Sequence, residues 1–209
     1  MRSKDALRVL AEITAYQWGM VTSAQASMHG VTRLDLSRLA ADGLLERLAH
    51  GVYKTTSTPS NDLDRLRAAW LSTDPKRLAH ERRTTDPDAV VFAGASAARV
   101  HGIGDLWDEH FDFITPVRRQ SQRREVRYRK RVLDPRDVTT VDGLPVLSVE
   151  ATIADLVEVV GDLSLVADAL RDAWRRGDLD TARLADLLDP ATLTRLTGLA
   201  DVGQGVARA

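Results

Sequence analysis

The sequence predicts an α+β protein of two domains, and three observations indicate this class. Two short helical segments and a hairpin pattern follow one another within residues 19–55. Amphipathic helical segments also precede and follow the middle of the chain. That middle part holds three strand-like runs and a second hairpin signal, at 89–92, 111–115, 126–132 and 138–146. We therefore expect an N-terminal helical domain with a hairpin, followed by a small mixed or antiparallel sheet with flanking helices.

The first domain starts with an amphipathic helix at residues 3–16. Thr22 and Gln25 then have the spacing of a capping box, in which each residue satisfies a free amide of the other at the start of a helix. Thr32 and Asp35 repeat this spacing, although Asp stands where Glu or Gln is usual. These signals predict two short helices that end at glycines, over residues 23–28 and 33–42.

The second of these helices presents a lightly polar face. Its inward residues are Leu36, Leu39 and Ala40, and the opposite face carries Leu34, Ser37 and Arg38, with Arg33 at the margin. A hairpin with a turn at His50-Gly51 follows. Helix, glycine turn, helix and hairpin is the order of a winged helix-turn-helix, whose second helix enters the DNA major groove. The alternative, a small helical cap on another domain, accounts less well for the hairpin at this distance.

Composition is that of a soluble globular protein, with 44% hydrophobic and 28% charged residues in 209. The absence of cysteine excludes disulfides, thiolate catalysis and Cys-based zinc sites. No apolar run has the length of a membrane span, and the N-terminal segment carries Asp5 and Glu12, unlike a signal peptide. We expect a cytoplasmic protein.

The polar, proline-containing stretch 56–61 is the expected linker. It divides the chain into a winged helix-turn-helix at 1–57 and an α+β domain at 61–200. A Gly/Ala-rich tail at 201–209 is expected to be disordered.

Charge is concentrated in one part of the second domain. Residues 118–131 contain eight Lys or Arg against the single Glu125, although the whole chain has a net charge of −1. The alternation along 126–132 predicts a half-exposed strand with an arginine face. Such a face either contacts phosphates or an acidic partner, or protects a sheet edge from pairing with other chains.

Catalytic interpretations are weak. Asp105, Asp108, Glu109 and Asp112 cluster near a strand as in some metal-dependent nucleases, but the nearest Glu-x-Lys equivalent ends in Arg127, which is too basic to transfer protons. The five histidines lack metal-ligand spacing, and no phosphate-binding glycine loop is present. We expect no enzyme activity, no metal and no cofactor.

The N-terminal patterns resemble the winged helix of AbiEi-type antitoxins. The residues that carry the resemblance are Gly19-Met20-Val21-Thr22, Gln25-Ala26, Gly30-Val31-Thr32, Leu36 with Leu39, Gly43-Leu44-Leu45 with Arg47, and His50-Gly51-Val52-Tyr53. Further along, three patterns are similar to the second domain of the same family: Gly94-Ala95-Ser96-Ala97-Ala98 with His101-Gly102, Gly143-Leu144-Pro145-Val146, and the run from Ala151 to Leu156.

This resemblance implies the antitoxin of a type IV toxin–antitoxin pair, encoded beside a nucleotidyltransferase-like toxin. It implies binding to inverted repeats in operator DNA, with two copies of a monomer or weak dimer per repeat, and repression of its own operon. Whether neutralisation requires a direct complex with the toxin stays open. The alternative is a stand-alone regulator whose second domain senses a ligand or dimerises. The candidate DNA-binding residues are Thr22, Ser23, Gln25, Thr32, Arg33, Leu34, Ser37, Arg38, Arg47, His50 and Lys54, followed by Arg118, Arg119, Arg123, Arg124, Arg127, Arg129 and Arg131.

Overall fold

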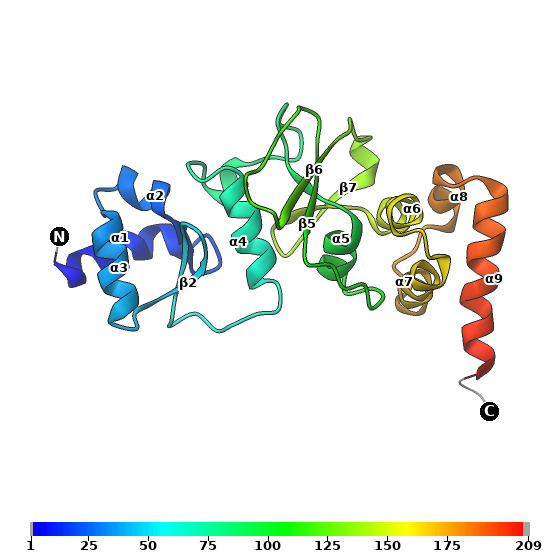
Figure 1. The fold of residues 1–209 in the computed structure, drawn as a ribbon, viewed down its shortest axis with the longest axis horizontal. Coiled ribbons are helices and arrows are strands. Elements are labelled where there is room, and N and C mark those ends of the chain that lie inside the picture. The colour runs from blue at the N-terminus through cyan, green and yellow to red at the C-terminus, as the bar shows by residue number, and fades with distance from the viewer. Residues whose placement is uncertain (1, 207–209) are drawn as a thin grey trace. The chain divides into compact units, whose positions relative to one another are not determined.

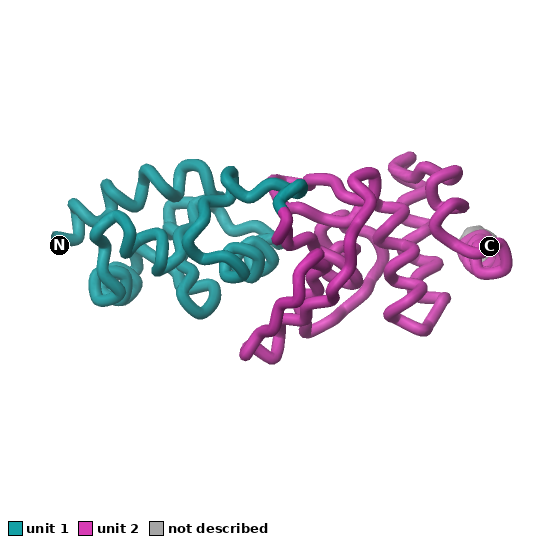
Figure 2. The backbone as a smooth tube through the Cα atoms, turned by 90° about the horizontal axis from the view of Figure 1, so that it is seen from above, with its two compact units in different colours: residues 1–86 teal, residues 87–209 magenta. Residues whose placement is uncertain are grey.

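A computed structural model describes residues 2–206 of the chain and confirms the α+β class (Figure 1). The chain forms two compact units, Met1–Asp86 and Pro87–Ala209 (Figure 2).

The first unit contains the helix pair and hairpin expected from the sequence. Its elements are α1 Ser3–Thr14, β1 Met20–Thr22, α2 Ser23–Met28, α3 Arg33–Ala41, β2 Leu45–Ala49, β3 Val52–Thr55, α4 Asp64–Thr73 and a 3-10 turn at Ala79–Glu81. The strands form an antiparallel sheet in the order β1-β3-β2. Strand β1 was not expected, because a three-residue strand is recognisable chiefly by its pairing with β3.

The hairpin between β2 and β3 turns at His50-Gly51, as expected, and Gly51 has a φ of 72°. A side chain with a Cβ rarely adopts that backbone conformation, which explains glycine at this position. Behind the hairpin, Leu10, Leu36 and Leu39 are buried in one apolar core with Val21 and Tyr53. This core fixes α3 relative to the strands.

Helix α4 belongs to the first unit, since it packs against β1, β2 and β3. Trp70 of α4 is buried, and its ring meets that of Trp18 edge-on with centroids 6.2 Å apart. The stretch expected as a linker is hydrogen-bonded to the first unit: the Thr56 hydroxyl donates to the Gly43 carbonyl at 3.0 Å, and the Pro59 carbonyl accepts from the Lys54 ammonium at 2.7 Å. The compact units therefore divide after Asp86, and not at 56–61.

The second unit is built on a five-stranded mixed sheet. Its elements are β4 Val91–Phe92, α5 Gly94–His101, β5 Phe111–Thr115, β6 Val126–Lys130, a 3-10 turn at Pro135–Asp137, β7 Val138–Val141, β8 Leu144–Leu147, α6 Val149–Val160, α7 Leu163–Arg176, α8 Thr181–Leu187 and α9 Pro190–Val206. The strand order is β6-β5-β4-β8-β7; β6 runs parallel to β5 and β4 parallel to β8, and the other pairs are antiparallel.

The Asp142-Gly143 hairpin forms as expected, with both residues at positive φ, which suits a type I′ turn. Helix α6 packs against α5, α7 and α8, and α7 packs against α9. Helix α9 was not expected, and it extends into the predicted disordered tail as far as Val206; residues 207–209 lie outside the described part of the chain.

Candidate nucleic-acid interface

Helix α3 is fixed at its first turn by its capping box. The hydroxyl of Thr32 accepts a hydrogen bond from the amide of Asp35 at 3.2 Å, and a carboxylate oxygen of Asp35 accepts from the Thr32 amide at 3.0 Å. The Thr32 hydroxyl also donates to this carboxylate oxygen at 2.6 Å, and this bond together with that from the Thr32 amide lowers the pKa of Asp35 to about 2. Because the inner face is buried through Leu36 and Leu39, the outer face points to solvent.

The outer face of α3 carries four of the candidate DNA-binding residues. Arg33, Ser37 and Arg38 are exposed, and Leu34 is 59% exposed despite its apolar side chain. Thr32 is also exposed at the start of the helix. A short helix with cations and small polar groups on its free face has the dimensions and chemistry of a recognition helix.

Thr22 and Gln25 occupy the interior and hold neighbouring backbone. The Thr22 hydroxyl accepts from the Gln25 amide and donates to the carbonyl of Pro75. The Gln25 side-chain amide donates to the Arg77 carbonyl at 2.9 Å, and Gln17 joins the same buried cluster. Their contacts are with protein, and Ser23 is only partly exposed. Sequence reasoning missed Gln17, because its place in this hydrogen-bonded cluster depends on partners that are distant in the chain.

The two cations of the wing hairpin occupy different environments. Arg47 is exposed and lies beside exposed His50, with Nη2 of Arg47 3.4 Å from Nδ1 of His50. The side chain of Lys54 is only 2% exposed; its ammonium donates to Asp64 and to the Pro59 carbonyl at 2.7 Å. Lys54 therefore does not lie on the wing surface, contrary to expectation, because β3 is the central strand and its side chain is covered by α4.

The arginine segment of the second unit is largely engaged in internal ion pairs. Asp112 of β5 lies opposite Arg127 of β6 in the strand register, and Nε of Arg127 donates to Oδ1 of Asp112 at 2.8 Å. Arg127 also pairs with Asp108, while Arg129 and Arg131 both contact Asp155 of α6. The arginine face of β6 is thus turned toward carboxylates of the same unit.

The remaining arginines divide into two pairs. Arg119 contacts Asp88 at 2.9 Å and Arg123 contacts Glu125 at 2.8 Å. Arg118 and Arg124 are exposed and lie outside the ion pairs of the segment. A local count of charge along the sequence therefore overstates the positive charge that this surface presents.

Two of the four carboxylates considered for a nuclease, Asp108 and Asp112, form ion pairs with Arg127. The hydrogen bond to Asp112 raises the pKa of Arg127, and although burial opposes it, hydrogen bonds from His110 lower the pKa of Asp108. Within residues 2–206, no group of three or more His, Asp or Glu side chains has the arrangement to hold a metal ion. No helix in the same range is long and apolar enough to cross a membrane.

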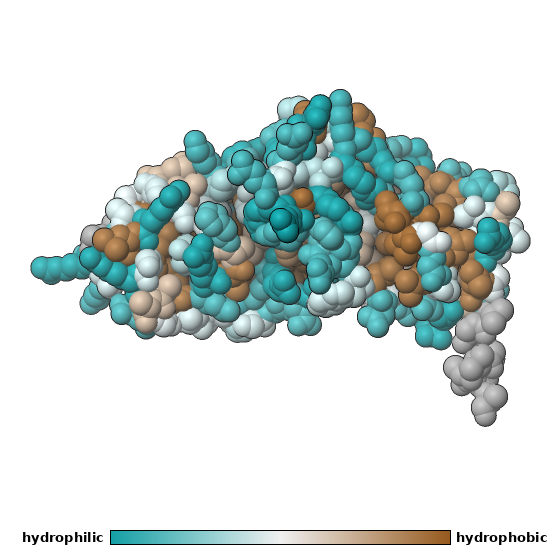
Figure 3. Space-filling model, viewed as in Figure 1, coloured by the Kyte–Doolittle hydropathy of each residue, from teal (hydrophilic) through white to brown (hydrophobic). Residues whose placement is uncertain are grey.

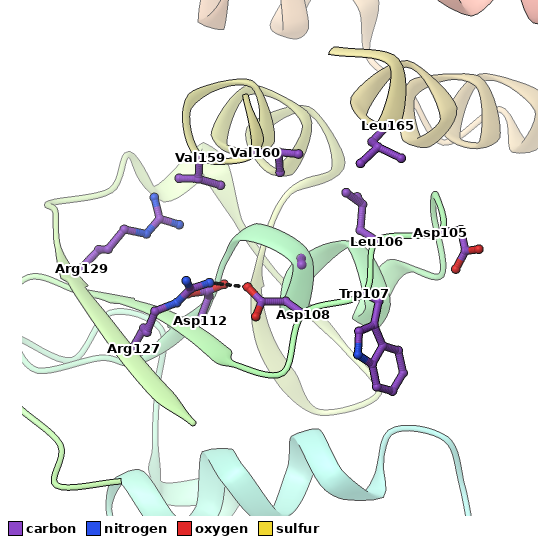
Figure 4. A pocket seen from close by; sticks show the side chains of 11 residues that line it. Asp105, Leu106, Trp107, Asp108, Asp112, Arg127, Arg129, Val159, Val160 and Leu165 are labelled. Atoms are coloured by element: carbon purple, nitrogen blue, oxygen red, sulfur yellow. Dashed lines mark hydrogen bonds and ion pairs between the residues drawn. The ribbon is translucent and has the colours of Figure 1, made fainter. Parts of the chain in front are cut away.

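Next to the arginine pairs, the second unit contains a pocket of about 390 Å³ (Figure 4). Arg127, Asp108 and Asp112 lie at one side, and Leu106, Val160 and Leu165 at the other (Figure 4). No sequence pattern pointed to it, since its residues come from α5, the loop after α5, β5, β6, α6 and α7.

Comparison with known proteins finds a family similarity within the first unit. Residues 8–54 match the model of a family described as transcriptional regulator, AbiEi antitoxin, and this range runs from within α1 into β3. The expected resemblance is thereby confirmed over the helix pair and the wing. The family consists of regulators and not of enzymes. No curated protein matches the chain.

The fold has a counterpart among solved structures. The crystal structure of the RV2827C protein from Mycobacterium tuberculosis superposes with a TM-score of 0.56 and 20% sequence identity, covering 95% of this chain and 76% of that one. At this identity the similarity supports the fold of the chain.

Proposed function

We propose that this chain, whose residues 8–54 carry the AbiEi signature, is an autorepressing antitoxin of a type IV toxin–antitoxin pair. It binds inverted repeats of operator DNA in the cytoplasm, with one copy on each half-site. It counteracts a nucleotidyltransferase-like toxin encoded beside it. No cofactor or metal takes part.

The observation that carries the proposal is the outer face of α3. Arg33 and Arg38 are one to two turns apart on a helix whose start is fixed by hydrogen bonds, so their guanidinium groups enter a groove from a rigid support. Arginine can bind guanine through two hydrogen bonds, and an exposed apolar side chain such as Leu34 can contact a thymine methyl group. Leu34 and Arg38 share the outer face of α3 and Arg33 lies at its margin, so base contacts are available from adjacent sides of one helix.

The wing and two arginines of the second unit supply phosphate contacts in this proposal. Arg47 and His50 are exposed on the hairpin next to α3 in sequence, and Arg118 and Arg124 are exposed and outside the ion pairs of β6. Phosphate contacts provide most of the non-specific affinity and its dependence on salt. Lys54 and the paired arginines contribute to the stability of the protein in this proposal.

Arg38→Ala tests the assignment of α3. We expect operator affinity, measured by fluorescence anisotropy on duplexes from the upstream region of the operon, to fall by about 1–3 kcal/mol if Arg38 contacts a base. Affinity for a scrambled duplex should change less. Arg65→Ala, which removes an exposed arginine of α4 outside the family match, is the matched control and should bind normally. Equal affinity of Arg38→Ala and wild type would remove Arg38 from the interface.

The antitoxin activity is tested separately by co-expression with the neighbouring toxin gene and measurement of growth. Restored growth supports an antitoxin. Continued arrest, with intact operator binding, favours the alternative of a stand-alone regulator whose second domain has another role.

A further inference from the structure

The pocket of the second unit has a size suited to a small organic molecule. Its volume of about 390 Å³ falls in the range typical of ligand sites, roughly 300–1,000 Å³. It lies between the end of α6, the start of α7, the loop after α5 and the edge strand β6 (Figure 4). All of these elements belong to one compact unit.

One wall of the pocket is apolar and open to solvent. Val159 is 46% exposed and Leu165 is 40% exposed, and they lie on either side of the turn between α6 and α7. Trp107, which also lines the pocket, is 75% exposed. Hydrophobic side chains gather on the surface over α6 and α7 (Figure 3). Covering such side chains by an apolar group removes their surface from water and is therefore favourable.

The opposite wall is charged, with more carboxylates than guanidinium groups. Arg127 pairs with Asp108 and Asp112, while Arg129 and Arg131 share the buried Asp155. Glu158 also pairs with Arg131. Of these groups, Asp108, Asp112, Arg127 and Arg129 line the pocket itself, and Asp105 lines it too, so three carboxylates there face two guanidinium groups.

This arrangement favours a cation over an anion. The arginine side chains that reach the pocket, Arg127 and Arg129, already donate to carboxylates, so an anion would have to compete with groups held permanently beside them. A carboxylate has about four acceptor positions, so Asp108 and Asp112 can accept a further hydrogen bond while they stay paired. An ammonium group supplies such donors.

We propose that this pocket binds a small organic amine whose apolar body lies against Val159 and Leu165 and whose ammonium group is directed to Asp108 and Asp112. The site is independent of the DNA-binding face on α3, and it gives the second unit the capacity to sense a cationic metabolite.

Three probes that share one apolar body test the charge preference on the full-length protein. They are phenethylamine, 2-phenylethanol and 3-phenylpropionate, which carry a positive, a neutral and a negative head group. For ligands of this size we expect dissociation constants on the order of millimolar, measured by isothermal titration or saturation-transfer NMR at constant ionic strength. Phenethylamine should bind about tenfold more tightly than 3-phenylpropionate, with the alcohol between them.

Variants locate the site. Val159→Lys places a long cationic side chain in the pocket and should abolish phenethylamine binding. The control variant Leu199→Lys adds the same charge at an apolar residue of α9 that is 40% exposed and does not line the pocket. This variant should bind phenethylamine as the wild type does. Asp108→Asn should reduce the preference for the amine over the alcohol while the alcohol still binds.

Circular dichroism and thermal melting establish that each variant is folded. Equal affinity for the three probes, tighter binding of 3-phenylpropionate, or unchanged phenethylamine binding by folded Val159→Lys would each overturn the proposal. None of these results depends on whether α3 binds DNA.

Discussion

Lys54 is buried in an ion pair with Asp64, so its replacement by Met should lower the free energy of unfolding. The ammonium group and its partner Asp64 are 2% and 10% exposed in their side chains, and Met has a similar length without the charge. Removing one member of a buried ion pair typically costs about 3–5 kcal/mol, because the other charge stays buried. Asp64 keeps hydrogen bonds from the amide of Asn61 at 3.0 Å and from Arg67 at 3.4 Å. We therefore expect a loss of about 3 kcal/mol for Lys54→Met, at the lower end of that range.

Urea unfolding followed by tryptophan fluorescence measures this loss. The assay uses a background with Trp107→Phe and Trp174→Phe, both exposed residues of the second unit, so that Trp18 and Trp70 report the first unit. In the same background, Lys54→Met combined with Asp64→Leu should recover part of the loss, because no charge is then left buried.

Operator binding completes the comparison. At a temperature where Lys54→Met is folded, its affinity for operator DNA should equal that of wild type. Arg47→Met, on the exposed part of the same hairpin, should give the reverse pattern of normal stability and weakened binding. An unchanged unfolding midpoint together with weakened binding for Lys54→Met would show that the ammonium reaches phosphates, and the reasoning from burial would be wrong.

Three further predictions concern charge. Arg47→Ala should weaken binding to operator and random duplexes alike and reduce the salt slope of affinity by about one, as measured by titrations at several salt concentrations. Joint replacement of Arg118 and Arg124 by Ser should lower DNA affinity and leave stability unchanged. Arg127→Ser should chiefly lower the melting temperature. Intact DNA binding by the Arg118/Arg124 variant would show that the segment does not contact DNA. The hydrogen bonds that lower the pKa of Asp35 stabilise α3 fully above pH 3.8 and lose their effect as the pH falls through about 2. Circular dichroism at low pH should therefore show a weaker acid dependence for Asp35→Asn than for wild type.

The sequence determined the local features of this protein. Each capping box links two residues that are three positions apart, so the pairs Thr22 with Gln25 and Thr32 with Asp35 could be predicted from the sequence alone. Both capping boxes form in the structure. The hairpin turn at Asp142-Gly143 follows from the conformations that these two residues tolerate. The alternation along β6 also predicted a strand with its arginines on one side.

Only the tertiary structure decided what those arginines face. Asp155 lies 26 residues after Arg129 and on a helix, so no count of charge along the chain reveals that the two form a pair. Likewise, Lys54 follows an exposed hairpin turn in sequence, yet Asp64 of α4 covers it once the helix docks on the sheet. Burial and pairing depend on which elements meet in space, whereas capping and turn formation depend on neighbours along the chain. For this reason helix α3 could be located from sequence, while the environment of each cation and the pocket beside β6 could not.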